Sequence, residues 1–322
     1  MDRDLGINLA RVTEGAALAS AKYLGQGDKN KSDQAAVNEM RDMFNLLNIN
    51  GTVVIGEGEI DEAPMLYIGE QIGDPDAQDQ VDIAVDPIDG TTALADGMPN
   101  AISVLAVTPK GNMLNAPDVY MKKIAVGPKA RGLVDINKPV SENIAIVAKS
   151  LNKNISDVTV TVLKRERHSK LVDAIRQTGA RINMINDGDV LPAIEACMAG
   201  GTDMLMGIGG APEGIIAAAA VKCLGGDFQA IFWPSDGKQV KRCMDKNIDL
   251  EKVYTIEDLV KGDDVVFAAT GITTGSLLKG VSYLESNSAT TESMLLRLPS
   301  YTVRRIDSIH QLDKKYPKKD AE

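Results

Sequence analysis

The sequence predicts an α/β protein built from two units, and three observations support this prediction. The first hundred residues alternate segments that carry apolar residues at helical spacing with short apolar runs typical of buried strands. Two of these runs end in acidic residues, as strands do where open α/β folds form their sites. The chain has 322 residues, enough for two units, which we expect at residues 1–160 and 161–322.

Two helices are expected at the start of the chain. Residues 5–24 carry apolar side chains at helical spacing and precede Gly25. Ser32 is expected to cap a second helix that runs to about Leu47. Asp33 would lie at the N-terminus of that helix, and the alternative is that its carboxylate only complements the helix dipole.

An apolar run at residues 83–85 is expected to form a strand that breaks at Asp86 and Pro87. Pro87 fixes its own φ and Gly90 permits a tight bend, so the turn would point two carboxylates and a carbonyl the same way. These are Asp86, Asp89 and the carbonyl of Ile88. Such a set suits a hard cation such as Mg²⁺ or Mn²⁺, and the alternative is an acidic turn.

Thr91 follows this turn at an expected helix N-terminus, where anions are favoured. The alternative role for its hydroxyl is an N-cap. Glu57 is a second acidic residue at the end of an expected strand. It follows the apolar run 52–55 and lies between two glycines. The acids that come next, Glu59, Asp61 and Glu62, have the alternative of a solvated loop.

Composition excludes several classes of partner. A formal net charge of −10 argues against nucleic acid or an anionic membrane surface. The three cysteines lack CxxC spacing, so we interpret them as buried thiols in a reducing compartment. No apolar run approaches membrane length and no signal-peptide pattern opens the chain, so a cytoplasmic location is expected.

The second half of the chain carries a basic cluster in an otherwise acidic protein. Residues 158–163 are expected to form a strand, with Arg165 and Arg167 after it. In an extended segment these two side chains would point the same way and clamp one phosphate; the alternative is a solvated basic turn. His168 has no histidine partner at ligand spacing, so we expect it to make structural hydrogen bonds.

Two further turns precede helices. Asp187 and Asp189 flank Gly188, and the alternatives for them are a turn former and an N-cap. Residues 207–210 are expected to form a bare glycine loop before a helix that starts near Glu213, where backbone N–H groups can cradle an oxyanion. No acidic residue follows about 20 residues on in a clear βαβ unit, which excludes a dinucleotide fold.

Residues 86–91 resemble the signature of the metal-dependent, inositol-monophosphatase-like sugar phosphatases. Further blocks resemble class II fructose-1,6-bisphosphatases specifically: residues 27–30, 56–59, 61–66, 117–123, 187–189 and 207–214. They occur in order along nearly the whole chain. One departure is that this chain has Asp89 where many class II members have Glu.

This resemblance implies a layered αβαβα sugar-phosphatase fold of two α/β units with the site between them. It implies that the metal ligands are Asp33, Glu57, Asp86, Asp89 and Glu213, with the carbonyl of Ile88. Thr91 and Asp89 would be catalytic, with Thr91 positioning or deprotonating the attacking water. The implied substrate-binding residues are Lys29, Asp89, Gly90, Thr91, Tyr120, Arg165, Glu166, Arg167, Asp187, Gly188, Asp189 and Gly210.

The implied activity is hydrolysis of the 1-phosphate of fructose 1,6-bisphosphate to fructose 6-phosphate, a gluconeogenic step, with Mn²⁺ or Mg²⁺. The resemblance also implies a homo-oligomer, either a dimer or a tetramer. Alternatives within the superfamily are a sedoheptulose-1,7-bisphosphate, inositol-phosphate or nucleotide-phosphate phosphatase. An alternative from another class is an inactive regulator that binds a metal or a metabolite, but the complete set of acids favours an enzyme.

Overall fold

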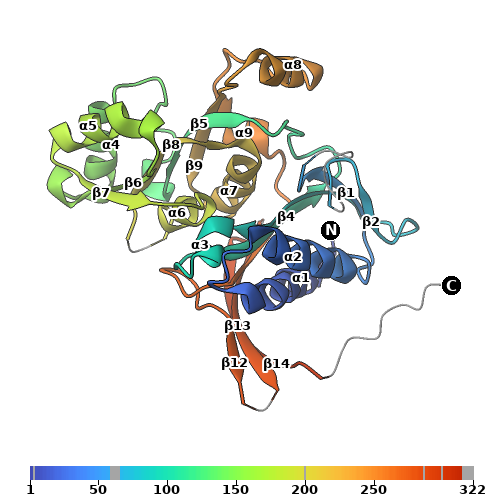
Figure 1. Ribbon diagram of the computed structural model, residues 1–322. Helices are drawn as coiled ribbons and strands as arrows, with labels where there is room; N and C mark the ends of the chain where they lie inside the picture. Colours follow the sequence, from blue (N-terminus) through green and yellow to red (C-terminus); the bar gives the residue numbers. More distant parts are fainter. Residues whose placement is uncertain (3, 59–65, 199–200, 286, 299, 314–322) are drawn as a thin grey trace. The chain divides into compact units, whose positions relative to one another are not determined.

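The computed structural model describes residues 1–2, 4–58, 66–198, 201–285, 287–298 and 300–313 (Figure 1). It divides into two compact units: unit 1 comprises Met1–Asn112 and Asp264–Glu322, and unit 2 comprises Met113–Asp263. Each unit combines one sheet with helices, so the expected α/β class is confirmed. The expected boundary after residue 160 differs from this division, because it falls within a strand of unit 2 and the last strands return to unit 1.

The sheet of unit 1 has the order β12-β13-β11-β4-β3-β1-β2, with β14 paired to β13. Among the described strands of this sheet, β1 and β3 alone pair in parallel. The strands are β1 (Asn50–Ile55), β2 (Gln71–Gly73), β3 (Gln80–Asp89), β4 (Ile102–Pro109), β11 (Val265–Gly271), β12 (Ser282–Leu284), β13 (Ser288–Leu298) and β14 (Thr302–Gln311).

The helices of unit 1 are α1 (Leu5–Ser20), η1 (Ala21–Tyr23), α2 (Lys29–Phe44) and α3 (Thr91–Ala95). Helix α1 packs on β11 and β13, and α2 packs on α1 and α3 (Figure 1). The expected cap of α2 is wrong. The Asp28 carboxylate accepts the N–H of Lys31 at 3.1 Å, so the helix begins three residues before Ser32. Ser32 instead donates to the carbonyl of Lys29 within the helix.

Strand β3 does not break at Asp86, contrary to the sequence-based expectation. It continues to Asp89, and its register against β4 shifts between these two residues. A proline can lie in a strand at such an irregularity, because its missing N–H is not needed there. The bend comes after the strand, where Gly90 adopts a φ of 96°, as expected, and α3 follows.

The sheet of unit 2 has the order β10-β9-β5-β8-β6-β7. Its strands are β5 (Tyr120–Val126), β6 (Thr159–Leu163), β7 (Arg181–Ile185), β8 (Met204–Gly210), β9 (Asp227–Phe232) and β10 (Tyr254–Thr255). Its α-helices are α4 (Val140–Leu151), α5 (Ser169–Thr178), α6 (Val190–Glu195), α7 (Ala211–Cys223), α8 (Gly237–Asp245) and α9 (Ile256–Leu259), and its short 3₁₀ helices are η2 (Pro128–Ala130), η3 (Ile155–Asp157) and η4 (Glu166–His168).

The glycine segment 207–210 is not the loop that we expected. It forms the end of β8 and pairs with β5, from Lys123 opposite Gly207 to Tyr120 opposite Gly210. Its backbone is therefore committed to the sheet, and α7 begins at the next residue. In the part of the chain that the structure describes, no helix is long and apolar enough to span a membrane.

Candidate active site

The acids of unit 1 follow two neighbouring parallel strands. Glu57 comes two residues after β1, and Asp86 and Asp89 lie at the end of β3. Because parallel strands end at the same edge of a sheet, the fold directs all three acids to that edge, as expected. Asp89 is buried, and the Asp86 carboxylate accepts the backbone N–H of Ile88 at 3.0 Å, which holds the bulged segment in shape.

Asp33 approaches this edge from α2. The Thr91 hydroxyl lies 3.4 Å from the Asp33 carboxylate and 3.1 Å from the carbonyl of Ile88, so it donates its single hydrogen to one of these two acceptors. Burial raises the pKa of the Asp33 carboxyl, while Thr91 and Lys29 oppose that shift. A desolvated carboxylate of this kind is stabilised by a cation.

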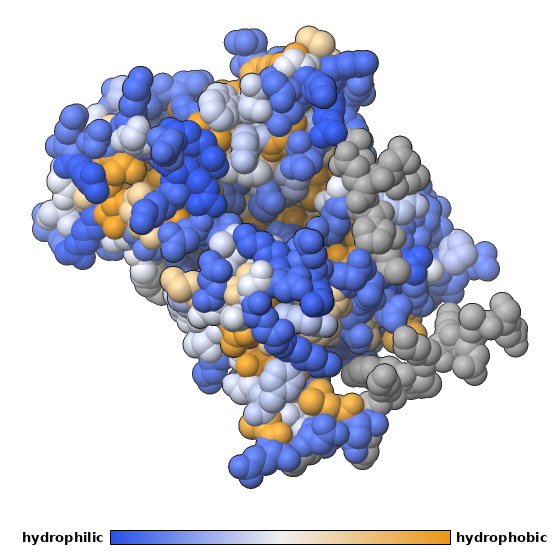
Figure 2. All heavy atoms as spheres, in the orientation of Figure 1, coloured by the Kyte–Doolittle hydropathy of each residue, from blue (hydrophilic) through white to orange (hydrophobic). Residues whose placement is uncertain are grey.

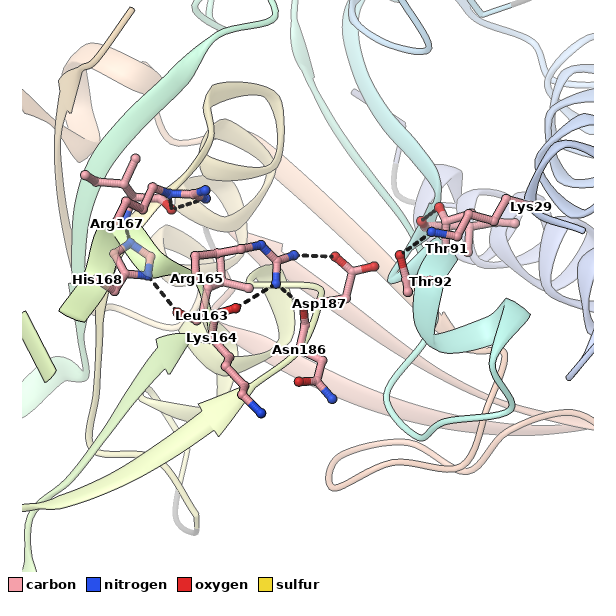
Figure 3. Close-up of polar contacts among 12 residues, drawn as sticks. Lys29, Thr91, Thr92, Leu163, Lys164, Arg165, Arg167, His168, Asn186 and Asp187 are labelled. Carbon is pink, nitrogen blue, oxygen red and sulfur yellow. Dashed lines mark hydrogen bonds and ion pairs between the residues drawn. The ribbon is translucent and has the colours of Figure 1, made fainter. Parts of the chain in front are cut away.

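Lys29 lies one helical turn before Asp33, and its ammonium donates to the hydroxyl of Thr92 at 2.8 Å (Figure 3). The contact joins the start of α2 to the start of α3. It keeps one positive charge next to Thr91. Gly90 is the N-cap residue of α3 and no side chain caps that helix, so the alternative role of Thr91 as an N-cap is excluded.

The donor atoms of unit 1 suit a divalent metal ion in their chemistry. Carboxylate and carbonyl oxygens are the ligands that Mg²⁺ and Mn²⁺ prefer, and Asp33 is desolvated. Among the described residues, however, no three Asp, Glu, His or Cys side chains gather closely enough to hold one ion. Glu59, Asp61 and Glu62 lie outside the described residues.

Unit 2 contains a buried cluster of charged side chains. Lys123 on β5 is 2% exposed, and its ammonium lies 2.9 and 2.8 Å from the two oxygens of Asp189. The same ammonium donates to the carbonyl of Gly210 at 2.9 Å. Asp189 is the N-cap residue of α6, as the alternative had it, but its side chain makes no cap bond to the helix and contacts Lys123 instead.

Glu213 stands in the first turn of α7 beside this cluster. Burial raises the pKa of its carboxyl, Lys123 opposes the shift, and Asp189 and Asp118 add to it. Within the described residues its Oε2 is buried and accepts no hydrogen bond. The glycines make room for these charges: a Cβ on Gly210 would overlap the Glu213 carboxylate, and one on Gly209 would overlap the Asp189 carboxylate.

Lys123 is the residue that sequence reasoning missed. It lay within a block that resembles the family, but it received no role. The available signal was the pair Lys122-Lys123 in a strand: neighbouring side chains point to opposite faces, so one of the two must point inward. Lys122 is exposed, and Lys123 is the inward one.

The two arginines do not point the same way, contrary to expectation, because η4 replaces the extended segment. Arg167 donates through Nε and Nη2 to the carbonyl of Ile208, at 3.2 and 2.8 Å, and stacks 4.6 Å above the ring of Tyr120. Arg165 donates to the carbonyl of Asn186 at 2.6 Å and lies 3.6 Å from Asp187 (Figure 3). Glu166 is exposed, and Gly188 adopts a φ of 68°.

His168 makes the structural hydrogen bonds that we expected. Its Nε2 accepts the N–H of Ile208 at 2.7 Å, and its Nδ1 lies 2.7 Å from the carbonyl of Leu163. Since Nε2 is an acceptor, the proton must be on Nδ1, which gives one neutral tautomer. His168 and Arg167 therefore fix η4 to the same residue of β8.

Comparisons with known proteins cover nearly the whole chain. A family model described as bacterial fructose-1,6-bisphosphatase, glpX-encoded, matches residues 3–310. Relatives include "Fructose-1,6-bisphosphatase 1 class 2" of Escherichia coli and "Fructose-1,6-bisphosphatase class 2" of Shigella flexneri. Each is 50% identical over 331 residues, which cover 98% of this chain and 98% of the relative. The matched range thus extends over both units.

Proposed function

We propose that this chain, which belongs to the glpX-encoded bacterial fructose-1,6-bisphosphatases, hydrolyses the 1-phosphate of fructose 1,6-bisphosphate to give fructose 6-phosphate and phosphate. The observation that carries the proposal is 50% identity to named class 2 enzymes along 98% of the chain. The range matched by the family model includes Asp33 and Glu213, the two carboxyls whose pKa burial raises in this structure.

The proposed cofactor is Mn²⁺ or Mg²⁺, held by Asp33, Glu57, Asp86, Asp89 and Glu213 with the carbonyl of Ile88. When bound, such ions neutralise phosphate charge and lower the pKa of a coordinated water. Two observations support this assignment from the protein side. Burial raises the pKa of both Asp33 and Glu213, and Oε2 of Glu213 is buried without a donor among the described residues. Both carboxylates would gain from a nearby cation.

Thr91 is proposed to orient the attacking water, and Asp89 to assist at the same strand end. The Thr91 hydroxyl lies between two acceptors, Asp33 and the carbonyl of Ile88. If its hydrogen goes to Asp33, an oxygen lone pair is left to accept a hydrogen from water and to fix that water's direction. A Thr91 that is held in this way reduces the number of orientations that the water samples, which is how positioning lowers a barrier.

Recognition of the sugar phosphate is proposed for Lys29, Gly90, Tyr120, Arg165, Glu166, Arg167, Asp187, Gly188, Asp189 and Gly210. The structure constrains two of these roles. Asp189 uses lone pairs on both oxygens for Lys123, so a sugar hydroxyl would donate to the lone pairs that remain. Nε and Nη2 of Arg167 both donate to the carbonyl of Ile208, so we assign the phosphate contact to Nη1.

We further propose that the protein acts in the cytoplasm as a homo-oligomer. Its net charge of −10 and its sugar-phosphate chemistry suit a small anionic substrate that is met by local cations. Nucleic acid is not an expected partner of a chain with this balance of charge.

Substrate profiling tests the proposed reaction. The purified protein is assayed for phosphate release from fructose 1,6-bisphosphate, sedoheptulose 1,7-bisphosphate, an inositol monophosphate and a nucleoside monophosphate, with the sugar product identified by mass and by a fructose-6-phosphate-specific coupling enzyme. We expect the highest kcat/KM for fructose 1,6-bisphosphate and fructose 6-phosphate as its product. A higher kcat/KM for the inositol phosphate would replace the proposal with its superfamily alternative, and no phosphate release from any substrate would favour the inactive regulator.

A further inference from the structure

Lys123 is a buried lysine to which the proposed function gives no role. Hydrophilic residues cover much of the visible surface of unit 2 (Figure 2), whereas the side chain of Lys123 is 2% exposed. Its neighbour in β5, Lys122, is exposed like an ordinary surface lysine. Burying an ammonium costs free energy unless the group is paired and hydrogen-bonded, so the contacts of Lys123 must compensate this cost.

The ammonium of Lys123 has three N–H donors, and three acceptor atoms lie within hydrogen-bond distance of it. They are the two carboxylate oxygens of Asp189, at 2.9 and 2.8 Å, and the carbonyl oxygen of Gly210 at 2.9 Å. All three donors are therefore directed to the protein, which leaves none for a ligand. Lys123 thus acts on a bound sugar phosphate through the groups that it holds.

The Asp189 side chain is turned toward Lys123 rather than toward the helix that Asp189 begins. Asp189 is 5% exposed, so its carboxylate contacts little water, and Lys123 compensates its charge. Because one ammonium contacts both oxygens, the carboxylate is held in one orientation. The lone pairs that Lys123 does not use then point in fixed directions.

Glycine residues bring the backbone close to this ion pair. A Cβ on Gly209 would lie 2.9 Å from Cε and 3.0 Å from Nζ of Lys123, and it would overlap the Asp189 carboxylate. A Cβ on Gly214, in α7, would lie 3.5 Å from the same ammonium. The backbone of β8 and α7 therefore packs against the pair, which restricts the rotamers available to both side chains.

Stability alone does not account for such a pair. A buried ion pair contributes little net stability, because the cost of desolvating both charges offsets their attraction, and an apolar pair of similar volume often serves as well. Binding sites, in contrast, need side chains whose orientation is fixed by a second layer of hydrogen bonds. Asp189 is a side chain of this kind, because it is proposed to accept a hydrogen from a sugar hydroxyl.

We propose that Lys123 is a positioning residue for sugar recognition, which holds the Asp189 carboxylate in the orientation that accepts a hydrogen bond from one ring hydroxyl. This inference rests on the proposed function, since Asp189 meets a sugar only if the substrate is a sugar phosphate. Lys123 does not touch the reacting phosphate in this role. Its loss should therefore raise KM and leave kcat largely unchanged.

The expected consequence is a loss of discrimination between sugars. A hydrogen bond to a charged group changes affinity by about ten- to a hundredfold. Wild type should prefer fructose 1,6-bisphosphate by this factor over the analogue that lacks the hydroxyl bound by Asp189, among analogues without the hydroxyl at C2, C3 or C4. In Lys123→Met the carboxylate is no longer fixed, so the same preference should fall below about threefold.

Steady-state kinetics of the full-length protein on fructose 1,6-bisphosphate and these analogues, with Mn²⁺ or Mg²⁺, test the proposal. Lys122→Met is the matched control from the same strand, and it should keep the wild-type preference. The melting temperature of each variant is measured alongside. A purely structural role would lower kcat/KM for every analogue by the same factor, so the ratio between analogues separates positioning from a general loss of folded protein.

A second comparison keeps the test decisive if Lys123→Met does not fold. It sets Asp189→Asn against the double variant Lys123→Met/Asp189→Asn, in which both partners of the pair are replaced and no partner is left as an unpaired buried charge. If Lys123 acts through Asp189, both proteins should lack the preference. Adding Lys123→Met should then change the ratio by less than about twofold.

Three results would overturn the proposal. The first is a folded Lys123→Met that retains the wild-type preference, and the second is a further change in the ratio when Lys123→Met is added to Asp189→Asn. The third is a wild type that hydrolyses all the analogues equally well, because Asp189 would then accept no ring hydroxyl. A wild type that does not hydrolyse fructose 1,6-bisphosphate at all would instead contradict the proposed function, on which the inference rests.

Discussion

Thr91 is the side chain through which the proposed chemistry can be separated from binding. Its hydroxyl reaches Asp33 and the carbonyl of Ile88, and it is not the cap of α3. Thr91→Ala should lower kcat by roughly 10²- to 10⁴-fold with little change in KM, the range typical of help with proton transfer or water positioning. Thr91→Ser keeps the hydroxyl and should retain much of the rate. Steady-state kinetics on both variants decides this, and an alanine variant with near wild-type kcat refutes the role.

Lys123 is the residue on which we expect the folded state of unit 2 to depend most strongly. It is the cation between the buried carboxylate of Asp189 and the carbonyl of Gly210, and Glu213 lies close by. Lys123→Met leaves these acids without their counter-charge, and breaking a buried ion pair costs about 3–5 kcal/mol. The free energy of unfolding from urea titrations at pH 7 measures the loss.

Lys122→Met is the matched control for Lys123→Met. It removes the same kind of side chain from the same strand, but Lys122 is exposed, and among the described residues its ammonium donates to the carbonyl of Ile136 alone. We expect a cost of about 1 kcal/mol for this hydrogen bond. Equal unfolding free energies for the two variants would show that the buried contacts of Lys123 stabilise the protein no more than the single hydrogen bond of Lys122.

At the scale of elements, η4 is fixed to β8 by a histidine that must stay neutral. Burial lowers the pKa of His168, and the nearby arginines, Arg167 and Arg165, lower it further, although Leu163 and Asp189 oppose them. Protonation would place an N–H of the ring against the N–H of Ile208 at 2.7 Å. The folded state therefore binds this proton less readily than the unfolded chain.

The sign of the pH effect follows from this difference. Below the unfolded pKa of about 6.5 the unfolded chain holds more protons, so stability is lost as pH falls from there toward the lowered pKa of the folded state. His168→Gln cannot titrate, so its Tm deficit relative to wild type should be largest near pH 7.5 and should shrink toward pH 5. Thermal melts of both proteins across this range test the prediction. A deficit that is the same at every pH would mean that His168 does not titrate in this window.

The elements that sequence could predict are those with a strong local signal. The apolar runs before Glu57 and Asp86 predicted two strands that end at one edge, and β1 and β3 are parallel neighbours. Ser32 was chosen as a cap because Ser is a good capping residue, but Asp28 competes for the same role and gains a contact with Lys31. Both contacts of Asp28 are with Lys31, three residues away, so the competing cap was available in the sequence, but its strength relative to Ser32 was not.

The glycines at 207–210 show a second limit of sequence reasoning. Glycine before a helix is typical of a loop, yet these residues form the end of β8, because glycine is needed where the carboxylates of Asp189 and Glu213 lie over the backbone. The same cluster explains why Lys123 was missed: its partners are 66 and 87 residues away in the chain. Pairings at such distances come from the tertiary fold.

At the scale of the whole molecule, the two units differ in whether one continuous segment of the chain forms them. Unit 2 is continuous, Met113–Asp263, with its own core, whereas unit 1 needs the C-terminal strands to complete its sheet. Residues 113–263 expressed alone should unfold cooperatively. Residues 1–112 alone lack β11, the partner of β4, and expose that buried strand as an edge, so they should not fold.

Thermal unfolding followed by circular dichroism checks both fragments. A cooperative transition in the fragment 1–112, or its absence in 113–263, would contradict this division of the chain. Adding the fragment 264–322 to 1–112 is the complementary test, because it restores β11, β13 and β14, and we expect a folded complex.

Metal-dependent hydrolysis of fructose 1,6-bisphosphate is the central claim, and one measurement tests it most directly. Phosphate release is followed after exhaustive chelation and after adding back Mn²⁺ or Mg²⁺, for wild type and Asp86→Ala, with melting temperatures to show that both are folded. We predict no turnover in the chelated wild type, restored turnover with a divalent ion, and none in Asp86→Ala at any ion concentration tested. Undiminished phosphate release from the chelated wild type would contradict the account.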